Sequence, residues 1–169
     1  PDNTAKGFDI TIERFLKDWL TQPLTLIFRK EFYNIEDFID YKHSRDVHLI
    51  YHLLRKGNGY YMKNIFATYN IHSGGLFSSA SSSKRLVTGY YIYKELYYKN
   101  KSDKYLKKVY VNVLYIMINR KVYLEDALFK KNHLILELLL LVKSKNDFKK
   151  FLLILNKQYV GLKNIFKKR

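Results

Sequence analysis

The excess positive charge of this 169-residue chain is confined to its second half. Residues 1–83 contain ten Lys or Arg and nine Asp or Glu, whereas residues 84–169 contain twenty-one and six. The net charge is thus +1 in the first half and +15 in the second. The net charge of +16 attracts polyanions, of which nucleic acids are the commonest.

Composition explains part of the lysine content but not its position. Lys outnumbers Arg 24 to 7, and Tyr (16) and Phe (11) are abundant. These residues, with Asn and Ile, share AT-rich codons, which indicates an AT-rich genome such as that of an organelle. Codon bias alone would give a lysine-rich surface in both halves. The near-neutral first half therefore favours a functional reason for the charge of the second.

Length and composition also exclude several classes of protein. A chain of this length with 47% apolar residues forms about one domain with its own core. The absence of cysteine excludes disulfides, thiolate zinc sites and a cysteine nucleophile. The longest apolar stretch, within 134–142, is too short to cross a bilayer. We therefore expect no membrane partner.

Apolar spacing predicts a helical N-terminal region over residues 1–83. The sequence KGNG at 56–59 is a stop signal for one of its helices. The Gly- and Ser-rich stretch 72–83 is typical of a linker, and the charge balance changes just after it. Helices are expected at 8–20, 34–41, 45–54 and 60–71.

The second half predicts an α+β module over residues 84–140. Two helices, 85–98 and 102–114, are separated by the turn Lys99-Asn100-Lys101, with Ser102 as a plausible N-cap and Asp103 beside it. Short strands are expected at 116–122 and 134–138, which together would form a β-hairpin. A basic tail helix is expected within 141–169. The predicted fold is thus a helical N-terminal half, a two-helix plus β-hairpin module and a basic C-terminal helix.

No catalytic signature stands out. His48 and His52 lie four residues apart on a predicted helix, a spacing that can hold a metal. The alternative is a helix face whose imidazoles meet solvent or cap neighbouring groups. A third ligand would have to be His43, Asp40 or Glu36. The acidic residues of this region are more typical of a solvated helix face, so we expect no metal, cofactor, catalytic residue or small-molecule substrate.

Basic and polar residues of the second half form the candidate RNA-binding set. Lys and Arg neutralise phosphates and release counterions, which gives affinity without reading sequence. Tyrosines interleaved among them can stack on unpaired bases. The candidates are Lys84, Arg85, Lys99, Lys101, Ser102, Lys104, Lys107, Lys108, Asn119, Arg120, Lys121, Lys130 and Lys131.

One stretch resembles a known RNA-binding module. IMINRKV at 116–122, followed after a spacer by LFKKNHLI at 128–135, resembles the closing hairpin of the small-subunit ribosomal protein four family, roughly I-x-V-N-G-K-x-V and then K-x-N/G-D-x-I. Arg120 replaces the hairpin glycine of that family, and His133 replaces its aspartate. The similarity spans residues 63–138 and includes the upstream segment Lys84-Arg85-Leu86, the turn 99–102 and the lysine-bearing helix after it.

The resemblance implies a structural rRNA-binding protein of the small subunit of an organellar, mitochondrial ribosome, with neighbouring ribosomal proteins as further partners. The same module occurs in tyrosyl-tRNA synthetases, pseudouridine synthases and a ribosome-associated heat-shock protein, so it implies RNA more firmly than it implies the ribosome. Two alternatives stay open. One is a small metal-dependent enzyme that uses His48 and His52, with the basic half as a docking arm. The other is a non-ribosomal RNA-binding, membrane-surface or assembly subunit of an organellar complex.

Overall fold

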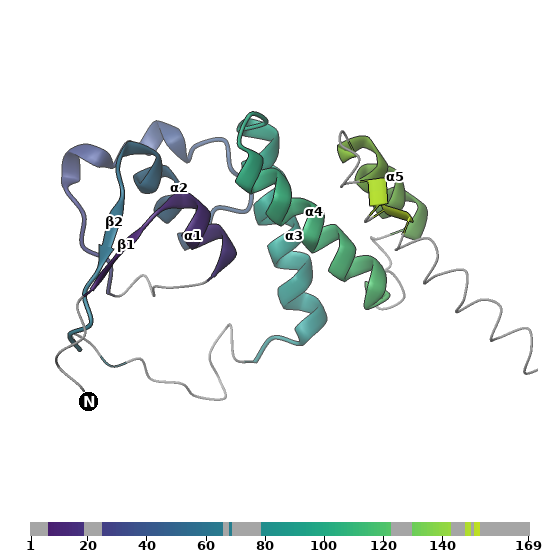
Figure 1. Cartoon of the computed structure of the whole chain (residues 1–169), viewed down its shortest axis with the longest axis horizontal. Helices are drawn as coiled ribbons and strands as arrows, with labels where there is room; N and C mark the ends of the chain where they lie inside the picture. Colours follow the sequence, from purple (N-terminus) through teal and green to yellow (C-terminus); the bar gives the residue numbers. More distant parts are fainter. Residues whose placement is uncertain are drawn as a thin grey trace, which may run out of the picture. The chain divides into compact units, whose positions relative to one another are not determined.

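The computed structural model describes residues 7–18, 25–65, 68, 79–122, 130–142, 148–149 and 151–152. This part of the chain is mostly helical and contains a two-stranded antiparallel sheet, in keeping with the expected α+β class (Figure 1). In chain order the elements are β1 (Phe8–Ile10), α1 (Ile12–Lys17), the short 3₁₀ helices η2 (Lys30–Phe32) and η3 (Ile35–Asp37), α2 (Asp46–Lys56), β2 (Gly59–Tyr61), α3 (Ser82–Lys99), α4 (Lys104–Asn119) and α5 (Lys131–Leu141).

The sheet corrects two helix predictions in the first half. β1 and β2 pair with Phe8 opposite Tyr61, and their rings stack with centroids 4.7 Å apart. Helix α1 begins only after Thr11, whose Oγ1 accepts a hydrogen bond from the Arg14 backbone N–H at 3.2 Å. A strand of three residues is too short to show the two-residue alternation of a strand. Each was therefore assigned to the helical spacing that follows it in the sequence.

Helices α2 and α3 confirm their predictions. α2 ends at Lys56, next to Gly57 of the expected stop. α3 begins after Ser81, whose side chain accepts a hydrogen bond from the backbone N–H of Lys84. The helix expected at 34–41 is reduced to η3. Ile35 and Ile39 stay exposed there, so no buried apolar face supports a longer helix.

Helix α4 overturns the first strand of the predicted hairpin. It continues without interruption to Asn119, through residues that were expected to be extended. Its buried residues recur at three- and four-residue steps, which is the period of a helix and not of a strand. They are Leu106, Tyr110, Val113, Leu114, Met117 and Ile118.

Helix α5 overturns the second strand. Residues 134–138 lie inside it, and its buried residues Leu134, Leu138 and Leu141 again follow helical spacing. The Tyr110 hydroxyl of α4 donates a hydrogen bond to the carboxylate of Glu137 on α5. The hairpin prediction at 116–122 and 134–138 is therefore wrong, because both segments bury one stripe of a helix and not one face of a strand.

The chain divides into two compact units, 1–109 and 110–169, with the boundary inside α4. The predicted division near residue 84 stays a prediction. Most of the Gly/Ser stretch, residues 66–67 and 69–71 of the expected helix at 60–71, the 123–129 spacer and most of the 141–169 tail lie outside the described residues. Within the described ranges, no helix combines the length and the apolar character needed to span a bilayer.

Two glycines predict opposite effects of the same substitution. Gly89 lies in the middle of α3 with open space where a Cβ would stand, so Gly89→Ala should stabilise the protein by about 0.5–1 kcal/mol through helix propensity.

A Cβ on Gly7 would lie 2.2 Å from the Tyr61 carbonyl oxygen. Gly7→Ala should therefore destabilise the β1–β2 pairing, by about 1–3 kcal/mol. Urea denaturation followed by circular dichroism measures both. A Gly7→Ala variant that is as stable as the unchanged protein, or more stable, would contradict this account of the sheet.

Candidate nucleic-acid interface

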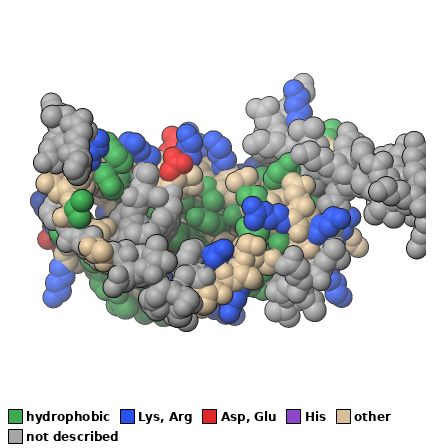
Figure 2. Space-filling model, turned by 90° about the horizontal axis from the view of Figure 1, so that it is seen from below, with side chains coloured by type: hydrophobic (Ala, Val, Ile, Leu, Met, Phe, Trp, Pro, Cys, Tyr) green, Lys and Arg blue, Asp and Glu red, His purple; other side chains and the backbone are tan. Residues whose placement is uncertain are grey.

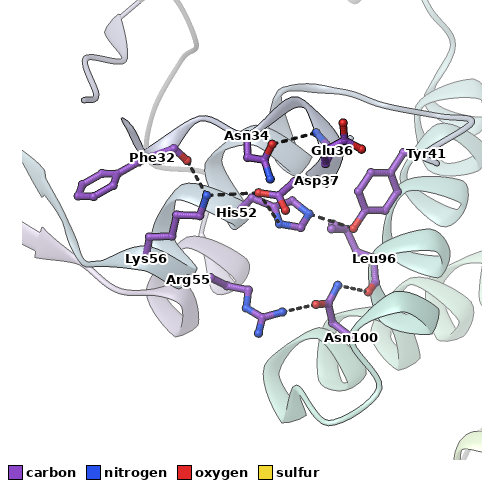
Figure 3. Close-up of polar contacts among 10 residues, drawn as sticks. All are labelled: Phe32, Asn34, Glu36, Asp37, Tyr41, His52, Arg55, Lys56, Leu96 and Asn100. Atoms are coloured by element: carbon purple, nitrogen blue, oxygen red, sulfur yellow. Dashed lines mark hydrogen bonds and ion pairs between the residues drawn. The ribbon is translucent and has the colours of Figure 1, made fainter. Parts of the chain in front are cut away.

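The corner between α3 and α4, residues 99–104, carries the densest group of the predicted RNA-binding residues in the first unit (Figure 1). Buried Asn100 ends α3: its backbone N–H donates to the carbonyl oxygens of Leu96 and Tyr97. Its side-chain Nδ2 also donates to Leu96, at 2.9 Å, and its Oδ1 accepts a hydrogen bond from Arg55 of α2 (Figure 3). The polar end of α3 is thereby tied to α2.

Asp103 begins α4 and makes the second tie. Its Oδ1 accepts hydrogen bonds from the backbone N–H groups of Tyr105 and Leu106, at 2.8 and 3.1 Å. Its Oδ2 accepts one from the Tyr51 hydroxyl of α2, at 2.9 Å. Burial and this hydrogen bond to a carboxylate raise the pKa of Tyr51, so Tyr51 stays the donor. Asp103, and not the expected Ser102, is the N-cap of α4, because its Oδ1 accepts the backbone N–H groups of Tyr105 and Leu106.

Three lysines of the corner each stand over a tyrosine ring. Lys99 Nζ lies 4.3 Å from the ring centroid of Tyr41, and the corresponding distances are 5.5 Å for Lys101 and Tyr98 and 4.9 Å for Lys104 and Tyr105. Lys99, Lys101, Lys104 and Ser102 are exposed, as is Lys108 one turn further along α4, whereas Lys107 is half-buried. Of these three rings Tyr98 is exposed, Tyr105 is half-buried and Tyr41 is buried.

The acidic residues of this region are engaged inside the fold. Residues 79–122 contain ten Lys or Arg and two acids, Glu95 and Asp103. Glu95 accepts hydrogen bonds from the ring Nδ1 of His43 at 2.8 Å and from its backbone N–H at 3.1 Å. Desolvation acts to raise the pKa of Glu95, but the hydrogen bonds from His43 outweigh it and leave that pKa lowered. Both acids are half-buried, and both carboxylates are hydrogen-bonded within the fold.

One exposed acid does approach the corner. Asp40 Oδ2 lies 3.3 Å from Lys99 Nζ, and its side chain is 78% exposed. An ion pair in water at this exposure contributes little, so it does not prevent Lys99 from meeting a phosphate. Across the face seen in Figure 2, Lys and Arg side chains lie singly or in small groups between apolar and uncharged surface. They do not form one continuous basic patch in that view.

The other predicted residues lie at helix ends. Lys84 and Arg85 are exposed in the first turn of α3, where Arg85 Nη1 donates to the Ala80 carbonyl at 2.8 Å. Asn119 is the last residue of α4, and Lys121 after it has a left-handed backbone with φ 55°. The remaining members of the set also flank helices of the second unit: Arg120 follows α4, Lys130 precedes α5 and Lys131 begins it.

This placement gives the Asn-Arg-Lys triplet a structural role of its own. The backbone N–H of Arg120 donates to the Ile116 carbonyl and that of Lys121 to the Ile118 carbonyl, which closes the last turn of α4. Positive charge beside a helix C-terminus also complements the helix dipole. The triplet ends a helix and is not the loop of a hairpin.

The two histidines of α2 face the interior of the first unit and a neighbouring loop. His48 is fully buried, with its ring 4.3 Å from that of Tyr41. His52 lies between two partners: its Nε2 is 3.0 Å from the Tyr41 hydroxyl and its Nδ1 is 4.0 Å from Asp37 (Figure 3). Lys56 binds the same carboxylate at 3.4 Å. Among the described residues, no group of three or more His, Cys, Asp or Glu could hold a metal ion.

His48 serves α2 as a capping residue. Its Nδ1 accepts a hydrogen bond from the Arg45 backbone N–H at 3.1 Å, so the proton of the neutral ring is on Nε2. Nε2 is buried and has no hydrogen-bond partner among the described residues. Burial lowers the pKa of His48 from its ordinary 6.5 to about 4; the charge of Glu95 opposes this shift, and His52 and Lys99 add to it. Burial also lowers the pKa of His52.

Most of the residues that hold the corner could not be predicted from local sequence patterns. Tyr51 and Arg55 lie about fifty positions before their partners, and nothing local marks them. Asp103 could have been found, because an aspartate directly before a helical run is as good an N-cap as the serine preceding it. Nothing in the sequence distinguishes Tyr98 and Tyr105 from the other tyrosines, of which the chain has sixteen in all.

Comparison of the chain with models of known protein families, with curated proteins and with solved structures found no match in any of the three. The corner must therefore be judged by its own geometry and charge.

The buried His48 predicts acid-sensitive folding. Because the folded pKa lies below that of the unfolded chain, the unfolded state binds the proton first, and stability falls as pH drops from about 6.5 towards 4. The loss should reach about 3 kcal/mol. His48→Gln cannot titrate, yet its amide oxygen can accept the Arg45 hydrogen bond as in a capping box. Urea denaturation at pH 7.5 and 5.0 should show a smaller pH effect in this variant.

The matched control is His133→Gln, because His133 is exposed on α5. This variant should keep the pH dependence of the unchanged protein. An equal pH effect in His48→Gln and His133→Gln would show that His48 is not the group that titrates.

Proposed function

We propose that this protein binds RNA as a structural component of an RNA–protein assembly, and that the α3–α4 corner is its main contact. The observation that carries the proposal is the charge of residues 79–122, where ten cations accompany two acids that are both engaged within the fold. Lysines on rigid helices can neutralise several phosphates at once without binding any one sequence.

The assembly that we propose is the small subunit of a mitochondrial ribosome. Support for an organellar setting comes from the abundance of residues with AT-rich codons. Support for the ribosome comes from the basic helix pair with its short turn, which resembles that of the small-subunit ribosomal protein four family. The helices at 116–119 and 131–141 remove the hairpin that was the most specific part of that resemblance. Co-sedimentation of the native protein with the small ribosomal subunit from mitochondria tests the setting, and sedimentation apart from ribosomes would count against it.

The near-neutral N-terminal region is proposed to face neighbouring proteins. Ile27, Ile35 and Ile39 are more than half exposed on the segment before α2. Exposed apolar side chains of this kind are offered to proteins and not to phosphates.

The corner predicts a specific loss of salt dependence in the intact protein. Replacing Lys101, Lys104 and Lys108 by alanine should reduce the slope of log affinity against log salt by about two to three, since each phosphate contact contributes about 0.7–0.9. The fold should survive, because these side chains are exposed. Filter binding of a structured RNA over a salt series measures the slope.

The control removes the same charge elsewhere. Lys17, Lys30 and Lys63 are exposed and lie before residue 84, so their triple alanine variant should change the slope by less than about one. Equal reductions in both variants would indicate non-specific attraction by net charge and would contradict a contact at the corner.

A further inference from the structure

We infer that the α3–α4 corner binds unpaired nucleotides of RNA, with a base stacked on Tyr98 and the adjoining phosphates held by Lys101 and Lys104. The inference deepens the proposed function and rests on it, since it names the form of RNA that the corner takes. Three observations carry it: the exposure of the Tyr98 ring, the cation above that ring, and the anchoring of the corner on α2.

Tyr98 offers a ring at the protein surface. It lies on the last turn of α3 and is 44% exposed, whereas its neighbour Tyr97 is buried and meets it edge to face with centroids 5.6 Å apart. Tyr97 thus supports Tyr98 from within the fold. An aromatic ring held in this way can accept a base on its face.

Lys101 lies 5.5 Å from the Tyr98 ring centroid. A nucleotide that binds here can contact Lys101 with its phosphate and the Tyr98 ring with its base. The phosphate attracts the ammonium group, and the base replaces it over the ring. A stacked base is held more strongly than a cation over an exposed ring, so the exchange favours binding. Lys104, three residues further on and exposed, is placed to meet the next phosphate.

The geometry favours an unpaired strand over a duplex. Bases of an A-form duplex are stacked on each other, and its major groove is too narrow for side chains to reach them. A duplex could use the lysines but not the Tyr98 ring. The corner is also fixed before RNA arrives, through Asn100 and Asp103 to α2, so stacking does not have to order it.

The test compares two RNAs of equal length, a single-stranded uridine oligonucleotide and a blunt-ended duplex, on the full chain. Tyr98→Leu should weaken single-strand binding about 5- to 100-fold, the loss expected for one stacked base. It should leave duplex binding and the salt slope unchanged. Tyr98→Phe keeps the ring and should keep the affinity. Tyr60→Leu is the control, because Tyr60 is 60% exposed on β2, away from the corner.

Each outcome has one meaning. Loss in Tyr98→Leu but not in Tyr98→Phe or Tyr60→Leu, confined to the single strand, supports the inference. Unchanged single-strand binding by Tyr98→Leu, or an equal loss on the duplex, overturns the inference and leaves RNA binding in place. Failure of the unchanged protein to bind either RNA overturns the proposed function as well. Circular dichroism of each variant confirms folding, and photo-crosslinking of 4-thiouridine RNA locates the contact at or away from Tyr98.

Discussion

The hydrogen bond from the Tyr51 hydroxyl to the Asp103 carboxylate positions the α3–α4 corner on α2. It joins the middle of α2 to the start of α4 while the other carboxylate oxygen caps that helix. The link from Arg55 to Asn100 repeats the arrangement at the end of α3. Asn100 thus ends α3 and Asp103 begins α4, and each also binds a residue of α2. The lysines at 99, 101 and 104 follow directly from this docked turn.

The corner can be highly charged and still ordered because different residues fix its backbone and carry its charge. Of the residues that fix the corner, Tyr51 and Asn100 are buried and Asp103 is half-buried, whereas Lys99, Lys101 and Lys104 are exposed. Repulsion among those lysines is relieved partly by the tyrosine faces beneath them. Binding of a polyanion would reduce this repulsion further.

Sequence patterns predicted the elements that depend on local chemistry. Gly57 and the turn at 99–101 marked helix ends correctly because caps and stops act within a few residues. The hairpin prediction failed because Ile116 to Ile118 is a short apolar run that fits a strand as well as a helix. Only its continuity with the apolar residues from Leu106 onward distinguishes the two. The pairing of β1 with β2 depends on residues about fifty positions apart, and no local pattern contains that information.

The capping of α4 by Asp103 has a consequence for how freely this surface can change. A helix N-terminus ordinarily offers backbone N–H groups to an anion in a fixed direction, but here a carboxylate already occupies them. In the RNA complex proposed above, phosphates are left to the lysines, whose long stems can reach over a range of positions. Such binding would place only weak directional demands on the RNA. Interchange of Lys and Arg, or movement of a cation by one helical turn, should be tolerated over evolutionary time, while Asp103 and Tyr51 should change only together.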